Sequence, residues 1–189
     1  MDSRDFKSSQ EDGFDRHAIP AEMPEGIIVR EDSIAQRFLD LGLPISAGVV
    51  LPRNFMTASA DDFIFESSTP TIRKLAKLAQ MELDVPGTTQ YFSIHENDDS
   101  IIAPVIAFAH PFLLDGGAVL AVEFLKEYAN HVRANWGAKK AKSANAVFTA
   151  SVVDGDISKS VTYKGPIEGL PSIVDAMTKV FGGDEASVG

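Results

Sequence analysis

Histidines are the residues of this sequence best suited to acid–base chemistry, because the charge of their side chain ordinarily changes near neutral pH. The chain has four of them, His17, His95, His110 and His131. None belongs to an HExxH pattern, and no two have the close spacing of a metal site on a helix. His110 lies in an apolar stretch ahead of Asp115. A histidine beside a carboxylate can serve as a general base, so His110 with Asp115 is the candidate enzyme site.

The competing interpretation of each histidine is structural, and the sequence favours it. His17 lies in a polar N-terminal segment, His95 at the end of an expected strand, and His131 off the apolar stripe of an expected helix. A buried histidine such as His110 is usually hydrogen-bonded to its neighbours. We therefore expect no catalytic residue, and an enzyme that uses His110 and Asp115 is the alternative to test.

No other motif identifies a cofactor or a metal. Asp115-Gly116-Gly117 precedes an expected helix, where free N–H groups attract anions, but its acidic residue repels phosphate and is a natural N-cap. The GxxxxGK[ST], GxGxxG and GxSxG patterns are absent. Asp61-Asp62 and Asp98-Asp99 lack the spacing of a calcium loop. Cysteine is absent as well, which removes thiolate metal sites and cysteine nucleophiles. We expect no cofactor and no metal ion.

The net charge argues against nucleic acids and membrane surfaces as partners. It is −10 at pH 7, so long-range repulsion opposes binding to either. Lys139, Lys140 and Lys142 form a local basic patch without aromatic neighbours, which we interpret as a solvated loop. The apolar segment 101–125 is interrupted by prolines and charged residues, so we expect no membrane span. The lack of cysteine and of a secretory signal fits a cytoplasmic protein.

The clearest structural pattern lies between Asn145 and Phe181. Residues 146–153 alternate as a strand does, Asp154-Gly155 is a strong hairpin signal, and residues 157–164 form the return strand. The polar face of the return strand is expected to be solvated. A helix is predicted over 170–181 from the spacing of its apolar residues. The residues expected to meet in one core are Phe148, Val152, Val161, Tyr163, Ile173, Met177 and Phe181.

Residues 88–136 repeat this order, with two strands around a turn at residues 97–99 and a long helix over 118–136. The fold class that we predict is α+β: a mainly antiparallel sheet built from two β-hairpin-helix units, with the helices packed on one face. Asp32 is expected to cap the first helix. The remaining expected elements are helices 33–41 and 69–84 and strands 26–30, 45–51 and 61–65.

The chain is predicted to hold one domain behind a disordered leader. Residues 1–25 mix charged residues, serines and prolines with isolated large apolar residues, too few to offset the entropy of ordering. Residues 26–189 have the length and the apolar content of a single α+β domain.

Three functions remain open, and a non-enzymatic protein-interaction or assembly module, homo-oligomeric or with a protein partner, leads. Strand 101–108 and the start of the long helix offer more apolar surface than a small monomer easily hides. The second is a small-molecule-binding domain, with a pocket between sheet and helices near Tyr91, His110 or Tyr163. The third is the enzyme that uses His110 and Asp115.

Overall fold

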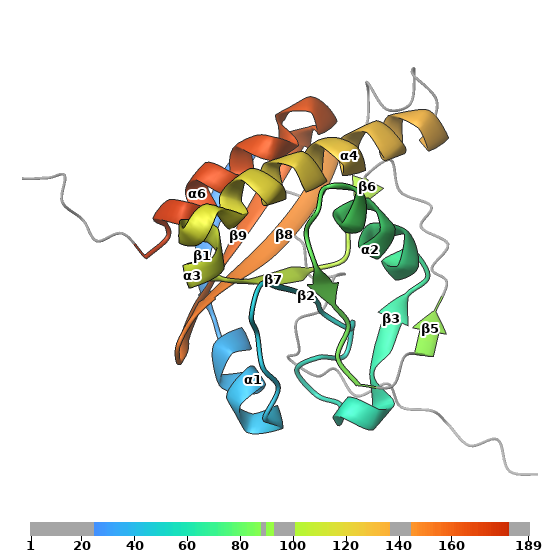
Figure 1. The fold of residues 1–189 in the computed structure, drawn as a ribbon. Helices are drawn as coiled ribbons and strands as arrows, with labels where there is room; N and C mark the ends of the chain where they lie inside the picture. The colour runs from blue at the N-terminus through green and yellow to red at the C-terminus, as the bar shows by residue number, and fades with distance from the viewer. Residues whose placement is uncertain (1–24, 88–89, 93–100, 137–144, 182–189) are drawn as a thin grey trace, which may run out of the picture.

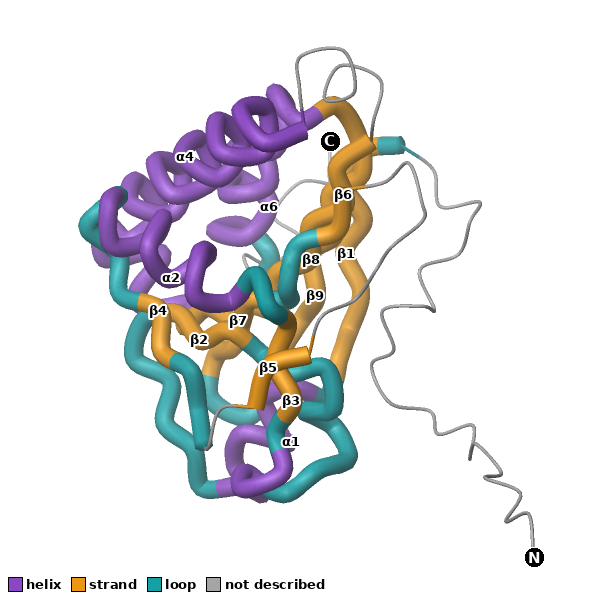
Figure 2. Tube along the Cα trace, turned by 90° about the vertical axis from the view of Figure 1, so that its right-hand side faces the viewer, coloured by secondary structure: helices purple, strands orange, loops and turns teal. Residues whose placement is uncertain are grey.

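A seven-stranded sheet forms the centre of the molecule, with helices on both of its faces (Figure 1, Figure 2). The computed structural model describes residues 25–87, 90–92, 101–136 and 145–181. The strands are β1 (Gly26–Asp32), β2 (Gly48–Val50), β3 (Ile64–Glu66), β4 (Leu83–Asp84), β5 (Gln90–Phe92), β6 (Ile101–Ile102), β7 (Ile106–Ala109), β8 (Asn145–Asp154) and β9 (Ile157–Pro166). The helices are α1 (Ile34–Leu41), α2 (Thr69–Leu78), α3 (His110–Phe112), α4 (Ala118–Trp136) and α6 (Ile173–Lys179), with 3-10 turns η2 (Ala60–Asp62) and η4 (Ile167–Ser172) and a π turn η3 (Leu113–Gly117).

The order of strands in the large sheet is β1-β9-β8-β7-β2-β4, and β6 also pairs with β8. A separate two-stranded sheet joins β3 and β5. The predicted helices over 33–41 and 118–136 are present as α1 and α4, and the first three predicted strands are present as β1, β2 and β3 with shifted ends. The leader expected over residues 1–25 lies outside the described residues except for its last one.

The hairpin of β8 and β9 is the part of the fold that the sequence predicts best. Each strand has ten residues, and the ladder between them is continuous. Gly155 takes the positive φ, 63°, that such a tight turn requires. Of the seven residues expected in one core, six are buried in a single cluster and Phe181 packs against it.

The sheet is mixed rather than mainly antiparallel, which corrects the predicted sheet while leaving the α+β class in place. β7 and β8 run parallel, as do β6 and β8, and β2 and β4. The predicted first hairpin is the reason: β5 pairs with β3 in the small sheet, whereas β6 and β7 join the large one. Helix α4 therefore connects two parallel strands, β7 and β8, as a βαβ crossover. The turn expected at residues 97–99 lies outside the described residues.

Helix α2 ends earlier than predicted, at Leu78 rather than at residue 84. The Met81 N–H donates to the Ala76 carbonyl (2.9 Å) and the Gln80 N–H donates to the Lys77 carbonyl (3.1 Å), with Gln80 at φ 59°. These are the two hydrogen bonds of a Schellman motif, with glutamine in the position that glycine usually takes. The apolar spacing predicts a longer helix because Leu83, beyond the turn, also faces the core.

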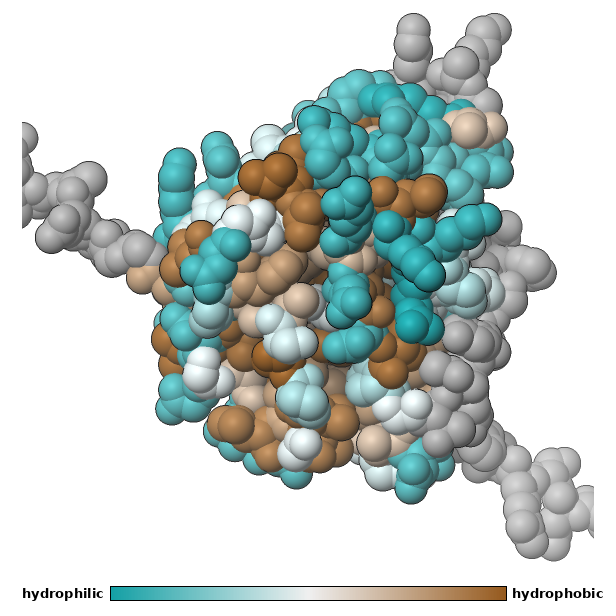
Figure 3. All heavy atoms as spheres, in the orientation of Figure 1, coloured by the Kyte–Doolittle hydropathy of each residue, from teal (hydrophilic) through white to brown (hydrophobic). Residues whose placement is uncertain are grey.

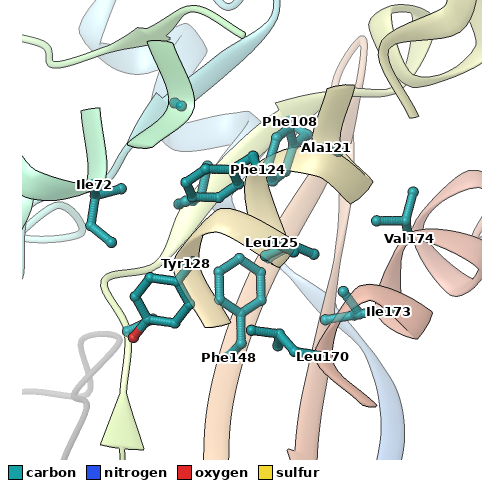
Figure 4. Packing of buried hydrophobic residues seen from close by; sticks show 14 of the residues in the cluster. Ile72, Phe108, Ala121, Phe124, Leu125, Tyr128, Phe148, Leu170, Ile173 and Val174 are labelled. Carbon is teal, nitrogen blue, oxygen red and sulfur yellow. The ribbon is translucent and has the colours of Figure 1, made fainter. Parts of the chain in front are cut away.

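Helices α2, α4 and α6 cover one face of the sheet and enclose the larger core (Figure 1). Figure 4 shows Leu125 of α4 close to the sheet residue Phe148 and to Leu170 and Ile173, whereas Phe124 lies on another side of the helix, near Phe108. Phe124 and Leu125 are neighbours in sequence and both are at most 1% exposed, so α4 is covered on more than one side, as its apolar first turns predict. None of the described helices is long and apolar enough to cross a membrane.

The opposite face of the sheet is covered by α1, so the helices do not all pack on one face as predicted. Alternate residues of β2, β7 and β8 point to this side and form a second buried cluster with α1. Its centre is a row of phenylalanines: the ring centroids are 4.9 Å apart between Phe38 and Phe55, and 5.8 Å apart between Phe55 and Phe63.

Part of this second face is polar, and the structure buries it instead of exposing it. Ser151 Oγ donates to Asp32 Oδ2 at 2.9 Å, and Ser158 Oγ donates to Asp32 Oδ1. The Ile34 N–H donates to Asp32 Oδ1 (3.0 Å), and the Ala35 N–H donates to Ser158 Oγ (2.9 Å). Asp32 thus accepts a hydrogen bond from the first residue of α1, but the N-cap position itself is Ser33, one residue later than predicted, and the Ser33 side chain makes no capping hydrogen bond. The expectation that the polar face of β9 is solvated is wrong at Ser158, which is 5% exposed.

Candidate functional site

His110 begins α3 directly after β7 and is only 8% exposed. Its Nδ1 lies 3.2 Å from Oδ2 of Asp154, and its Nε2 lies 3.3 Å from the carbonyl oxygen of Thr178. The carboxylate beside this histidine is therefore Asp154 and not Asp115. Asp115 is exposed in the π turn, and it has no hydrogen bond or ion pair within the described part of the chain.

The register of two parallel strands explains this pairing. Ala109 of β7 lies opposite Val153 of β8, so the next residues of the two strands, His110 and Asp154, come out of the sheet side by side. The sequence predicts Asp154 only as the start of the hairpin turn. The sequence signal that would reveal the pair is the β7–β8 register, which the predicted antiparallel arrangement does not contain.

The chain between His110 and α4 bends sharply at the same place. Asp115 has φ −86° and ψ 31°, and Gly116 has φ 93°, a conformation that favours glycine. The bend turns the chain from α3 into α4. The Asp115 side chain makes no capping hydrogen bond in this turn, so the predicted N-cap role is not seen.

Two basic side chains meet the end of α6. Lys159 Nζ donates to the Val180 carbonyl at 3.3 Å and lies 5.6 Å from the centroid of the Phe181 ring. The His110 ring meets the same Phe181 ring edge to face, at a centroid distance of 5.0 Å. The C-terminal end of a helix carries partial negative charge, which favours such donors. We call His110, Asp154, Lys159 and Phe181 the C-terminal clamp.

Both ring nitrogens of His110 face hydrogen-bond acceptors. A carboxylate and a backbone carbonyl accept hydrogen bonds and do not donate them. His110 lies between Asp154 on one side and the Thr178 carbonyl on the other, and a neutral imidazole can donate a hydrogen bond to only one of these two acceptors. Through Asp154, the Thr178 carbonyl and the Phe181 ring, His110 connects the end of the sheet to α6 and the residues that follow it.

The three residues named for a small-molecule pocket are not brought together. Tyr91 belongs to the small β3–β5 sheet. Tyr163 lies six residues from the hairpin-tip end of β9, counted from Ile157 to Tyr163, which is about 20 Å along a strand, whereas His110 contacts the tip at Asp154. No shared pocket follows from these positions.

The Tyr163 hydroxyl is enclosed by backbone. It donates to the Pro166 carbonyl at 2.6 Å. A Cβ added at Gly165 or at Gly169 would collide with this hydroxyl, so both glycines are needed for the close approach. Burial, followed by the negative charges of Glu168 and Glu25, raises the pKa of Tyr163 above its usual value of 10.0.

The other residues with chemical potential form no site among the described residues. His131 contacts Asn135 on the exposed side of α4. No group of three or more His, Asp or Glu side chains that could hold a metal ion occurs within residues 25–87, 90–92, 101–136 and 145–181. His17, His95, Asp98, Asp99 and the lysines at 139, 140 and 142 lie outside these ranges.

The outer edge of β1 is the most open part of the sheet. β1 stands first in the strand order, and β9 is its one partner among the described strands. Five of its seven residues are exposed, including Ile27 at 39% and Val29 at 47%. Figure 2 shows β1 at the margin of the sheet, beside β9. The sequence predicts this strand over 26–30 but assigns it no role, and the signal it holds is a run of three β-branched residues ahead of three charges.

Comparison of the chain with protein-family models, with curated proteins and with solved structures finds no match. The site must therefore be judged on its own geometry.

Proposed function

We propose that this protein is a non-enzymatic interaction or assembly module that binds a protein partner along the outer edge of β1. The observation that carries the proposal is a seven-residue edge strand whose apolar side chains Ile27 and Val29 stay exposed. A strand at the edge of a sheet presents unpaired backbone N–H and C=O groups, and an extended segment of another chain can pair with them.

The first four residues of β1 lack the features that usually protect such an edge. Edge strands are commonly shortened, bent by a bulge or interrupted by proline or lysine. β1 contains no proline and no lysine, and its ladder with β9 runs over all seven residues without a bulge. Its charges are confined to the last three residues, Arg30, Glu31 and Asp32, so the first four residues form an uncharged stretch of edge.

The apolar residues of β7, for which the sequence predicts a partner, are buried inside the molecule. All four residues of β7 are buried, since this strand lies between β8 and β2. Near the start of α4, Leu114 and Val119 remain 60% and 66% exposed. On the face seen in Figure 3, apolar side chains lie in several patches interrupted by hydrophilic ones. The β1 edge differs from these patches because it also offers backbone groups for pairing.

The proposal is tested by backbone amide exchange and by light scattering. Among residues 27–31, the amide protons that point away from β9 are expected to exchange more slowly in the associated state than in a dilute sample, while those of exposed loops do not change. Val29→Lys places a charge on the edge and is expected to abolish this difference. Leu78→Lys is the matched control, because Leu78 is an exposed apolar residue, 64% exposed, on α2. A 20.3 kDa species at every concentration, with unprotected β1 amides in the presence of cell extract, would refute the proposal.

The competing functions receive less support. The clamp geometry does not favour an enzyme that uses His110 and Asp115, and the separation of Tyr91, His110 and Tyr163 does not favour a common ligand pocket. A cytoplasmic location remains part of the proposal and is supported by the absence of cysteine from the sequence.

A further inference from the structure

We infer that the partner at the β1 edge is a second copy of this chain, paired antiparallel with the two-fold axis at Ile28. This inference rests on the proposed function, and it adds the identity of the partner and the register.

A two-fold axis that joins two sheets edge to edge stands perpendicular to the sheet, so each face of one copy continues into the same face of the other. Residues that lie opposite each other in an antiparallel pair also point to the same face. In β1, Ile27, Val29 and Glu31 lie opposite Tyr163, Val161 and Lys159 on the face covered by α6, and the other residues point to the α1 face. Opposed residues must therefore both be odd or both be even, which places the axis at a residue and not between two residues.

Only one of these positions opposes each of the apolar residues Ile27, Ile28 and Val29 to another of the three. An axis at Ile28 places Ile28 against Ile28 of the second chain. It also places Ile27 of each chain against Val29 of the other. An axis at Val29 instead places Ile27 against Glu31 and Ile28 against Arg30. An axis at Arg30 or at Glu31 sets like charges directly against each other, which is destabilising.

The interior of each protomer continues the apolar surface formed in this way. Ile27 and Val29 lie beside Tyr163 and Val161 of β9, which are 6% and 0% exposed. Pairing at Ile28 joins the exposed Ile27 and Val29 of both copies into one apolar strip on the helix-covered face. It also places Arg30 beside Gly26 of the second chain, where no side chain obstructs it.

The charges predict how such a dimer responds to salt. Each chain carries −10, and the Ile28 register places Glu25 opposite Glu31 of the second copy. The repulsion between the two net charges and the repulsion between the opposed glutamates are both screened by salt. The association is expected to strengthen between about 0.05 M and about 0.5 M NaCl. A basic partner would show the opposite dependence, so weakening with salt would overturn the inference in favour of a different protein.

The absence of cysteine permits a direct test of the register with single-cysteine variants of the full chain. Opposed residues in an antiparallel pair have Cα atoms about 4.5–5.5 Å apart, within the range of a disulfide. Ile28→Cys is therefore expected to form a disulfide-linked dimer under mild oxidation. Val29→Cys is displaced by two residues and Arg30→Cys by four, so both are expected to cross-link at least about tenfold more slowly, because Cα atoms beyond ~7 Å cannot be bridged without backbone movement.

The outcomes separate this inference from the proposed function. Fastest cross-linking at position 28, with slow cross-linking at position 30, supports both. Fastest cross-linking at position 29 or 30 overturns the register. β1 amides that are protected only by another protein, without cross-linking at any of the three positions, overturn the second copy as partner and leave the proposed function standing. A monomer at all concentrations, with unprotected β1 amides and no cross-linking, overturns both. Circular dichroism of each variant confirms that it is folded, and Leu78→Cys on α2 measures random collision.

Discussion

The two faces of the β8–β9 hairpin are buried to a similar degree, but different interactions stabilise them. On the face toward α4 and α6, Phe148 and Val161 are 1% and 0% exposed in the larger core. On the face toward α1, Ser151 and Ser158 are 0% and 5% exposed and donate hydrogen bonds to Asp32. Apolar burial stabilises in proportion to area. A buried hydrogen bond contributes little net stability but is costly to break on one side only.

The largest effect is expected from the apolar face. Phe148→Ala removes a ring that lies beside Leu125 and Leu170 (Figure 4), and it is expected to lower the free energy of unfolding by about 3–5 kcal/mol. The adjacent Thr149→Ala is the control on the other face. Thr149 Oγ1 lies 3.1 Å from Thr162 Oγ1, and losing this bond is expected to cost about 0.5–1.5 kcal/mol. Urea unfolding of both variants gives the two values, and equal costs would contradict the distinction between the faces.

A smaller effect is expected from the polar face. Asp32→Ala leaves two serine hydroxyls and the Ile34 N–H without their acceptor, so the free energy of unfolding is expected to fall by about 1–3 kcal/mol. Asp32→Asn keeps one side-chain oxygen and is expected to recover part of the loss. Urea unfolding again measures both. If Asp32→Ala proved neutral, the polar face would contribute nothing specific to the fold.

These two faces also show what alternation can predict. The apolar face could be predicted from the sequence, because Phe148, Val152 and Val161 recur with the period of a strand and apolar side chains are usually buried there. The burial of the polar face could not be predicted in this way. Whether Ser158 is solvated depends on a carboxylate 126 residues away in sequence, and no local pattern encodes such a partner.

The strand directions could not be predicted from the sequence for a related reason. A helix between two strands can follow a hairpin or can connect parallel strands, and the residues of α4 are compatible with both. The β7–β8 register that selects the second arrangement depends on which strands pair, and it also decides that His110 meets Asp154. The sequence therefore singles out His110 but not Asp154, the carboxylate that lies beside it.

A third experiment compares the observed partner of His110 with the predicted one. Asp154→Ala removes the carboxylate beside His110 Nδ1, and we expect the free energy of unfolding to fall by about 1 kcal/mol. Amide exchange in residues 173–181 is expected to accelerate, since the clamp holds this segment. Asp115→Ala is the control and is expected to change the free energy of unfolding by no more than about 0.5 kcal/mol, as most surface substitutions do. A larger effect of Asp115→Ala than of Asp154→Ala would restore the predicted pair.

The smallest effect concerns Tyr163, at the far end of the hairpin from the clamp. Its pKa is raised above 10.0, chiefly by burial. Above about pH 10 the unfolded chain ionises this phenol while the folded chain keeps it protonated, so unfolding releases a proton and stability falls as pH rises. Below pH 10 both states are protonated, and the contribution is fully present. Tyr163→Phe cannot ionise, but it also loses the hydrogen bond to the Pro166 carbonyl.

Urea unfolding at two pH values separates these two consequences. At pH 8 the wild-type chain is expected to be more stable than Tyr163→Phe by about 1 kcal/mol, the contribution of one hydrogen bond. At pH values above 10 this difference is expected to shrink, because only the wild-type chain loses stability through this phenol. A difference that stays constant or grows would mean that the folded state binds the ionised phenol as well as the neutral one. The enclosure of the hydroxyl by Gly165, Gly169 and the Pro166 carbonyl argues against that, since none of these groups stabilises a phenolate.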